Sequence, residues 1–178
     1  MKKFIITINK LKEIERSGWV ERGIKKPEST ADHSFMTALF CMTFANKNIN
    51  KEKAIKMALV HDLAESLVGD IITTESWQEG GKMPEKEKIK LEESAMNKLM
   101  KLLNTKNSNE IMKLWNEFEE QKTKEAKFVR DIDVADMIIQ AKIYHRKKNY
   151  KKPLQGFWDE KSLSRIRNKN IRKFVEMF

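Results

Sequence analysis

The sequence has few of the residues that interrupt regular structure. Its 178 residues include only six glycines and three prolines, the residues that most often end helices and form tight turns. A sheet protein built from many hairpins needs more of both, so their scarcity favours long helices. Because the hydrophobic fraction is 40%, enough apolar side chains remain for the core of one domain.

Cysteine and long hydrophobic runs are also scarce. The single cysteine, Cys41, excludes an internal disulfide and gives no sign of an oxidising compartment. No stretch approaches the roughly 20 apolar residues that a membrane span requires. The apolar run near the N-terminus, residues 4–8, is too short for a signal peptide. We therefore expect a cytoplasmic protein without a membrane partner.

Charge is abundant but mixed. The net charge of +10 suggests a polyanionic partner such as nucleic acid. The basic residues are mostly lysines, scattered from Lys2 to Lys173 among 26 acids, whereas nucleic-acid surfaces more often combine arginine with aromatic residues. This distribution favours an ordinary solvated surface and argues against nucleic acid as the partner. The positive charge would also speed the encounter with a small anionic substrate.

Apolar residues recur at helical spacing along most of the chain. The pattern predicts helices over approximately residues 3–14, 29–46, 51–67, 84–103, 111–118, 123–149 and 160–176. Loops are expected at residues 15–27 and 69–84. Without an internal repeat or a linker, the sequence predicts an all-α fold, a single helical bundle of about six to seven helices spanning residues 1–178.

The adjacent residues His61 and Asp62 are candidate metal ligands. His61 and Asp62 follow the apolar segment 57–60, where a solvated pair would be out of place, and Glu65 lies one helical turn further on. Adjacent helical residues point about 100° apart, so both can bind one ion only at a helix end or between helices. His33 and an acid from residues 123–149 would complete a site with two histidines and two aspartates. Such ligands suit a divalent ion and leave positions for water and a phosphate oxygen.

Six blocks, in order along the chain, make the pattern specific. They are RSGWV (16–20), PESTADHS (27–34), ALVHDLAE (58–65), VGDI (68–71), LWNEFE (114–119) and EAKFVRDID (125–133). With these blocks the sequence resembles the HD-domain superfamily of metal-dependent phosphohydrolases, and within it the 5'-deoxynucleotidase-like branch. The resemblance covers about residues 11–150 and leaves 151–178 as a C-terminal helical extension of a single HD domain.

The resemblance implies a set of metal ligands. These are His33, His61, Asp62 and Asp133, with Asp131 as the competing choice for the fourth. The bound ion would be Mn, Co or Mg, with Zn, Fe or Ni as alternatives. Asp136, one turn beyond Asp133, would lie on nearly the same helix face and could hold a water or an extra ion.

The resemblance also implies catalytic and substrate-binding residues. Glu65 and Asp70 match the two catalytic acids of the family. The reaction needs both, since one carboxylate must orient or deprotonate the attacking water and the departing oxygen needs its developing charge neutralised. Trp19 matches a tryptophan that lies near the sugar, and Arg16 and Arg22 could bind phosphate with paired donors. Some relatives have arginine where this chain has Gly18.

Other residues are candidates for ligand support, phosphate binding or a dimer interface. Arg130, one turn before Asp133, could orient that ligand or contact phosphate. Relatives are commonly homodimers, and Trp115 with the pair Phe157-Trp158 could form such an interface.

Three functions are compatible with these residues. The favoured one is hydrolysis of deoxyribonucleoside 5'-monophosphates, with a nucleotide as the small-molecule substrate. The alternatives are hydrolysis of another nucleotide (cyclic, triphosphate or signalling), and a non-enzymatic nucleotide- or nucleic-acid-binding module. Two-metal phosphodiesterases of the superfamily use additional histidines, and this chain has only His145 to spare. The histidine count therefore favours one metal and a monoester substrate.

Overall fold

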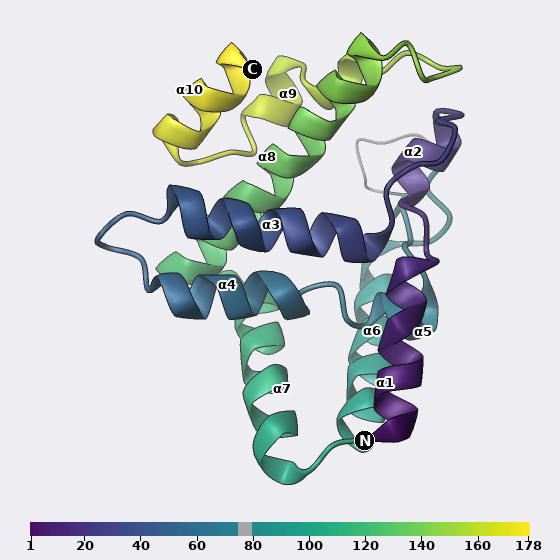
Figure 1. Ribbon diagram of the computed structural model, residues 1–178, viewed down its shortest axis with the longest axis vertical. Helices are drawn as coiled ribbons and strands as arrows, with labels where there is room; N and C mark the ends of the chain where they lie inside the picture. The colour runs from purple at the N-terminus through teal and green to yellow at the C-terminus, as the bar shows by residue number, and fades with distance from the viewer. Residues whose placement is uncertain (75–79) are drawn as a thin grey trace.

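A computed structural model describes residues 1–74 and 80–178, and over these residues the chain is built from helices (Figure 1). The α-helices are α1 (Lys2–Ile8), α2 (Ser17–Glu21), α3 (Thr30–Phe44), α4 (Lys51–Val60), α5 (Glu65–Val68), α6 (Glu85–Met100), α7 (Thr105–Glu120), α8 (Lys124–Arg146), α9 (Glu160–Leu163) and α10 (Lys169–Met177). Two short 3-10 helices, η1 (Asn9–Lys12) and η2 (Gln155–Phe157), complete them. Within the described ranges, β pairing is limited to two isolated bridges. The predicted all-α fold is confirmed.

Side-chain caps explain where several of these helices begin. Ser29 accepts the backbone N–H of Asp32 at the start of α3, and the Asp32 carboxylate accepts the N–H of Ser29 in return. This reciprocal pair satisfies backbone donors that the first helical turn leaves without partners. Asn104, Thr123 and Asn168 cap α7, α8 and α10 in the same general way.

The helices pack in two connected groups. Helices α3 and α4 run side by side in opposite directions, and the long helix α8 crosses behind them and contacts both (Figure 1). Their interface forms the larger core, in which Met57, Ile132 and Ile138 are completely buried. A second core lies between α1, α6 and α7, where Phe4, Met96, Leu99 and Trp115 pack together. In the part of the chain that the structure describes, no helix is long and apolar enough to cross a membrane.

The predicted helix over residues 51–67 is wrong in one important respect. Helix α4 ends at Val60, and α5 begins only at Glu65. Between them the backbone bonds shorten to three-residue steps, such as Leu63 N–H to the Val60 carbonyl and Glu65 N–H to the Asp62 carbonyl. This tightening rotates the chain relative to a regular α-helix, and it brings consecutive side chains to the same cavity.

Other boundaries also differ from the predictions. The expected loop over residues 15–27 contains the short helix α2, and the expected last helix is divided into α9 and α10. The helix predicted over 3–14 tightens into η1 after Ile8. Of the loop predicted over 69–84, residues 75–79 lie outside the described residues.

The aromatic residues proposed for a dimer interface are mostly interior. Trp115 is 3% exposed and Phe157 is 1% exposed, so neither can contact a second molecule in this fold. Trp158 is half-buried, with its ring 5.3 Å from that of His145. The expectation of an interface at Trp115 and Phe157 is therefore wrong: apolar packing within the chain already uses both rings.

Candidate metal centre and active site

A cavity of about 640 Å³ lies between the two helical groups. Helices α2, α3, α6, α7 and α8, the turn between α4 and α5, and the segment before α10 all contribute to its wall. Eight of the predicted site residues line it: Arg16, Trp19, His33, His61, Asp62, Glu65, Asp70 and Asp133. Arg22 is absent from the described lining, and its guanidinium lies 5.6 Å from the centre of the Phe157 ring instead.

His61 ends helix α4 with its ring fixed by the backbone. Its Nδ1 lies 2.7 Å from the carbonyl oxygen of Ala58; because a carbonyl only accepts, Nδ1 carries the proton. In the neutral imidazole Nε2 holds the lone pair, and this buried atom has no hydrogen-bond partner in the described structure. It lies 3.2 Å from Oδ2 of Asp62. A buried lone pair beside a carboxylate oxygen is what a cation would satisfy.

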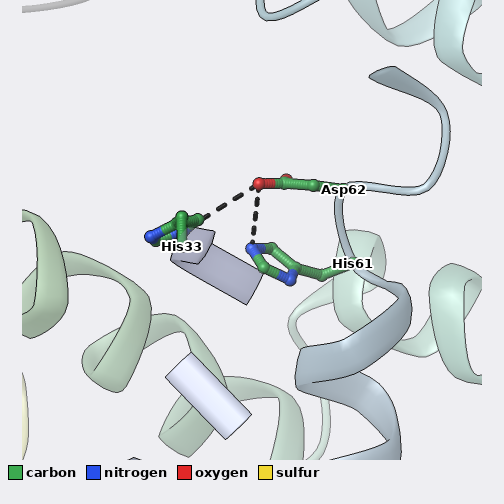
Figure 2. A group of neighbouring side chains, drawn as sticks. All are labelled: His33, His61 and Asp62. Atoms are coloured by element: carbon green, nitrogen blue, oxygen red, sulfur yellow. Dashed lines mark ion pairs between the residues drawn. The ribbon is translucent and has the colours of Figure 1, made fainter. Parts of the chain in front are cut away.

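His33 on α3 brings a second nitrogen to the same place. Its Nδ1 donates to Oδ2 of Asp136 at 2.8 Å, while Nε2 lies 3.1 Å from Oδ1 of Asp133 and 3.8 Å from Oδ2 of Asp62. Figure 2 shows the Asp62 carboxylate meeting both imidazole rings. One ligand atom from each of His33, His61 and Asp62 lies within 4.8 Å of the others. These residues therefore fit a divalent ion, with Asp133 adjacent.

Neighbouring groups in the cluster shift the pKa values of His33 and Asp62. Burial and the nearby Arg16 both disfavour a charged His33, yet hydrogen bonds to Asp133 and Asp136 raise its pKa well above the usual value. Burial likewise opposes ionisation of Asp62, but His61, Arg16 and His33 hold its pKa well below the usual range. A divalent ion bound here would replace protons on the imidazoles as the positive charge beside the carboxylates, because metal ligation requires neutral imidazole and ionised carboxylate.

The three aspartates of α8 have different partners. Asp133 points into the cavity, where Arg130 lies 3.3 Å from its second oxygen. Asp136 supports His33, as described above. Asp131 is buried and accepts the backbone N–H groups of Arg167 at 3.1 Å and Asn168 at 2.8 Å. Asp131 therefore anchors the segment before α10 and is engaged away from the two histidines.

Glu65 lines the cavity and is 2% exposed. The Thr30 hydroxyl donates to its Oε2 at 2.8 Å, and Arg16 Nη1 lies 3.5 Å from its Oε1. Burial, with the charges of Asp62 and Asp70, raises the pKa of Glu65 well above its usual value. The surroundings of Glu65 therefore favour its protonated form more than water does, as is common for acids in functional sites.

Asp70 is positioned by the glycine before it and by Ser17. Gly69 adopts a φ of +80°, a conformation that residues with a side chain rarely adopt, and it returns the chain from α5 towards the cavity. Oδ2 of Asp70 accepts the Ser17 N–H at 2.6 Å, and Oδ1 lies 3.4 Å from Arg16 Nη1. Arg16 thus contacts Asp62, Glu65 and Asp70 through one nitrogen.

Trp19 is both a core residue and part of the cavity wall. Its ring packs 4.5 Å from Phe157 and 5.4 Å from Tyr144, measured between ring centres. The indole N–H donates to Oε1 of Glu28 at 2.8 Å. The position of the indole is therefore fixed on three sides, which suits a residue that limits the space beside a ligand.

Several functional candidates escaped the sequence analysis. Lys88 and Glu92 on α6 line the cavity and form an ion pair at 3.5 Å. Arg165 and Arg167 line it from the segment before α10. Their spacing in the sequence is that of ordinary surface residues, and no motif marks them. Ser17 and Thr30 lie within the matched blocks, so proximity to the motifs was the available signal for those two.

The fold and this constellation agree with comparisons to known proteins. The HD domain family model matches residues 8–174, so the chain belongs to the HD-domain family. A mouse protein named 5'-deoxynucleotidase HDDC2 is 39% identical over 157 residues, which cover 88% of this chain and 76% of the mouse protein. A fission yeast protein, 5'-deoxynucleotidase hdd1 of Schizosaccharomyces pombe, is 40% identical over 158 residues, covering 86% and 77% of the two chains.

A solved structure supports the same relationship. A crystal structure of a Pyrococcus horikoshii protein aligns with a TM-score of 0.77 at 35% sequence identity, covering 99% of this chain and 95% of that one. The similarity thus extends through the C-terminal helices as well as the matched blocks.

Proposed function

We propose that this protein is a metal-dependent phosphohydrolase that releases phosphate from deoxyribonucleoside 5'-monophosphates. The observation that carries the proposal is the convergence of the two imidazole Nε2 atoms with the Asp62 carboxylate, beside the buried acid Glu65. Its placement in a cavity large enough for a nucleotide supports a small-molecule substrate. The names of the mouse and yeast relatives support the deoxynucleotide class.

The proposed metal ligands are His33, His61, Asp62 and Asp133. A divalent ion, with Mn, Co or Mg favoured, would supply a Lewis acid for a phosphate oxygen and lower the pKa of water. Asp136 and the Ala58 carbonyl would keep the two imidazoles in the tautomers that present Nε2.

The proposed catalytic acids are Glu65 and Asp70. Glu65, held by Thr30, would accept the proton of the attacking water, because its carboxyl group is buried in the wall of the same cavity as the proposed metal ligands. Asp70 would orient the phosphate-binding side of the cavity through Arg16 and Ser17. Trp19 would lie against the sugar, and Arg16 would contact phosphate; Arg22 would support this end through Phe157, which packs on Trp19.

The direct test is phosphate release after removal of bound metal. The protein is treated with a chelator, dialysed, and supplied with Mn, Co or Mg in the presence of deoxy- and ribonucleoside 5'-monophosphates, cyclic nucleotides and triphosphates. We expect metal-dependent release from deoxyribonucleoside monophosphates above all others. Release from a triphosphate or cyclic nucleotide alone would show that the substrate is not a deoxyribonucleoside monophosphate. No release from any nucleotide would reject the enzymatic function.

We also propose a cytoplasmic homodimer. The unpaired, buried Cys41 supports a reducing compartment. Phe35, Leu39 and Met42 recur at helical spacing on α3, and each is at least 43% exposed. Such an apolar stripe suits contact with a second copy. Sedimentation of the purified protein gives its mass, and a monomer at micromolar concentration would reject the dimer.

A further inference from the structure

The cations of the cavity wall differ in how fully they are engaged. Five described basic residues line the cavity: Arg16, Lys88, Arg130, Arg165 and Arg167. Arg16 lies within 3.5 Å of three carboxylates. Arg130 contacts Asp133 and lies over the Phe118 ring, 4.2 Å from its centre. A phosphate group would therefore compete with carboxylates for both of these arginines.

Lys88 differs from these arginines. Among the described residues, its ammonium group has one ion pair, to Oε1 of Glu92 at 3.5 Å, which is at the long end of hydrogen-bonding distance. A lysine has three N–H donors, so this contact leaves donors to spare. The side chain is 24% exposed, which places it in the wall of the cavity and still open to solvent.

The field of the site acids extends to Lys88. Burial lowers its pKa, but Glu92, Glu65, Asp62 and Asp70 together raise it above the usual value. Acids in the cavity wall repel an approaching phosphate dianion, and Asp62, Glu65, Asp70 and Asp133 all line it. A cation with spare donors within reach of their field would offset that repulsion.

We propose that Lys88 binds the phosphate group of the substrate through its ammonium. An ammonium acts as a compact point charge towards phosphate and does not need the paired geometry of a guanidinium. The flexible stem lets it move from Glu92 to an incoming anion while remaining on α6. This inference rests on the proposed phosphohydrolase function and adds a substrate contact that none of the sequence motifs contains.

The test compares three variants loaded with the same metal. Lys88→Met removes the charge and keeps an apolar stem, Lys88→Arg keeps the charge, and Lys90→Met removes an exposed charge two residues away on the same helix. Calorimetry measures the Kd of inorganic phosphate, and steady-state assays measure KM and kcat for a deoxyribonucleoside monophosphate. Thermal unfolding and metal content check that each variant is intact.

We expect Lys88→Met to weaken phosphate binding and raise KM by about tenfold or more, the size of one charge-assisted hydrogen bond. Lys88→Arg should recover most of this loss, and Lys90→Met should match the parent. Equal phosphate affinity in Lys88→Met and the parent would overturn the inference, as would an equal loss in Lys90→Met. If the parent hydrolyses no nucleotide, the proposed function fails, yet the phosphate titrations still decide whether Lys88 binds phosphate.

Discussion

Two parts of the cavity lining are built differently. The acid–histidine wall (His33, His61, Asp62, Asp133) is the more buried part, with the imidazole side chains each 1% exposed. The basic wall (Lys88, Arg165, Arg167) is more open, and among the described residues its lysine has one long ion pair. Both parts line the same space.

The difference corresponds to two tasks. Metal ligands must hold a fixed geometry before the ion arrives, so each histidine of the acid–histidine wall has its second nitrogen bonded to Ala58 or Asp136. A substrate enters and leaves in every turnover, which favours side chains that can move. Four substitutions in and beside the cavity wall test this difference through metal binding, turnover and stability.

Replacing His61 by alanine should have the largest effect. The variant lacks the Nε2 atom that would bind the metal, so we expect loss of both bound metal and phosphate release. Metal content after dialysis and an assay with added Mn check this. His145→Ala is the matched control, because its ring packs against Tyr150 and Trp158. A His61→Ala protein with the metal content of the parent would contradict the assignment.

Glu65→Ala should separate chemistry from metal binding. We expect the variant to keep its metal while kcat falls by about 10²–10⁴-fold, the usual contribution of a general acid or base. Glu65→Gln retains an acceptor for the Thr30 hydroxyl and should lose similar activity with less change in folding. Turnover equal to that of the parent would remove Glu65 from the mechanism.

Asp136→Asn tests the support behind His33. Losing the carboxylate weakens the hold on Nδ1 without removing a ligand, so metal affinity should fall by about 10–100-fold. Asp131→Asn changes another buried acid on α8 whose partners are backbone groups of residues 167 and 168. Titration with metal should show unchanged affinity in that control, and equal losses in both would indicate a general effect on α8.

Glu92→Gln should have the smallest effect, visible in the pH dependence of stability. Burial, with Glu119 and Asp62, raises the pKa of Glu92 from 4.5 to about 7 despite the opposing charge of Lys88. The folded protein therefore keeps a proton that the unfolded chain has released. Stability should fall as pH rises from about 4.5 to about 7 and show no further loss from this group above that range.

Glutamine at position 92 cannot ionise, so its variant should lack this component. Urea unfolding at pH 5 and pH 8 measures the change, and the variant should gain up to about 3 kcal/mol relative to the parent between the two values. Identical pH profiles for the two proteins would show that Glu92 is ionised like an exposed acid.

Sequence reasoning reached the acid–histidine wall far better than the basic wall. Periodicity predicted α8 within a few residues because a long helix repeats its apolar pattern many times. His61 and Asp62 were recognisable as neighbours inside matched blocks. The break between α4 and α5 was not predictable, since it depends on burying Glu65 and on three-residue backbone bonds that no local residue demands.

The basic wall depends on contacts between distant parts of the chain. Lys88 and Arg165 meet the same cavity only after α6 and the segment before α10 have packed. In the sequence, the motif match favoured Asp133 as the fourth ligand and left Asp131 as the competing choice. The structure shows that Asp131 accepts two backbone N–H groups. Contacts between residues far apart in the sequence produce no local sequence pattern from which they could be predicted.

The bond between His61 and Ala58 connects the site to the end of a helix. Because Nδ1–H is donated to a carbonyl in the last turn of α4, an ion held by Nε2 would also resist fraying of that turn. Amide hydrogen exchange at residues 60–65 should therefore slow when metal is added, by a factor that reports occupancy. Exchange rates at the end of α4 would therefore measure how much of the protein has metal bound.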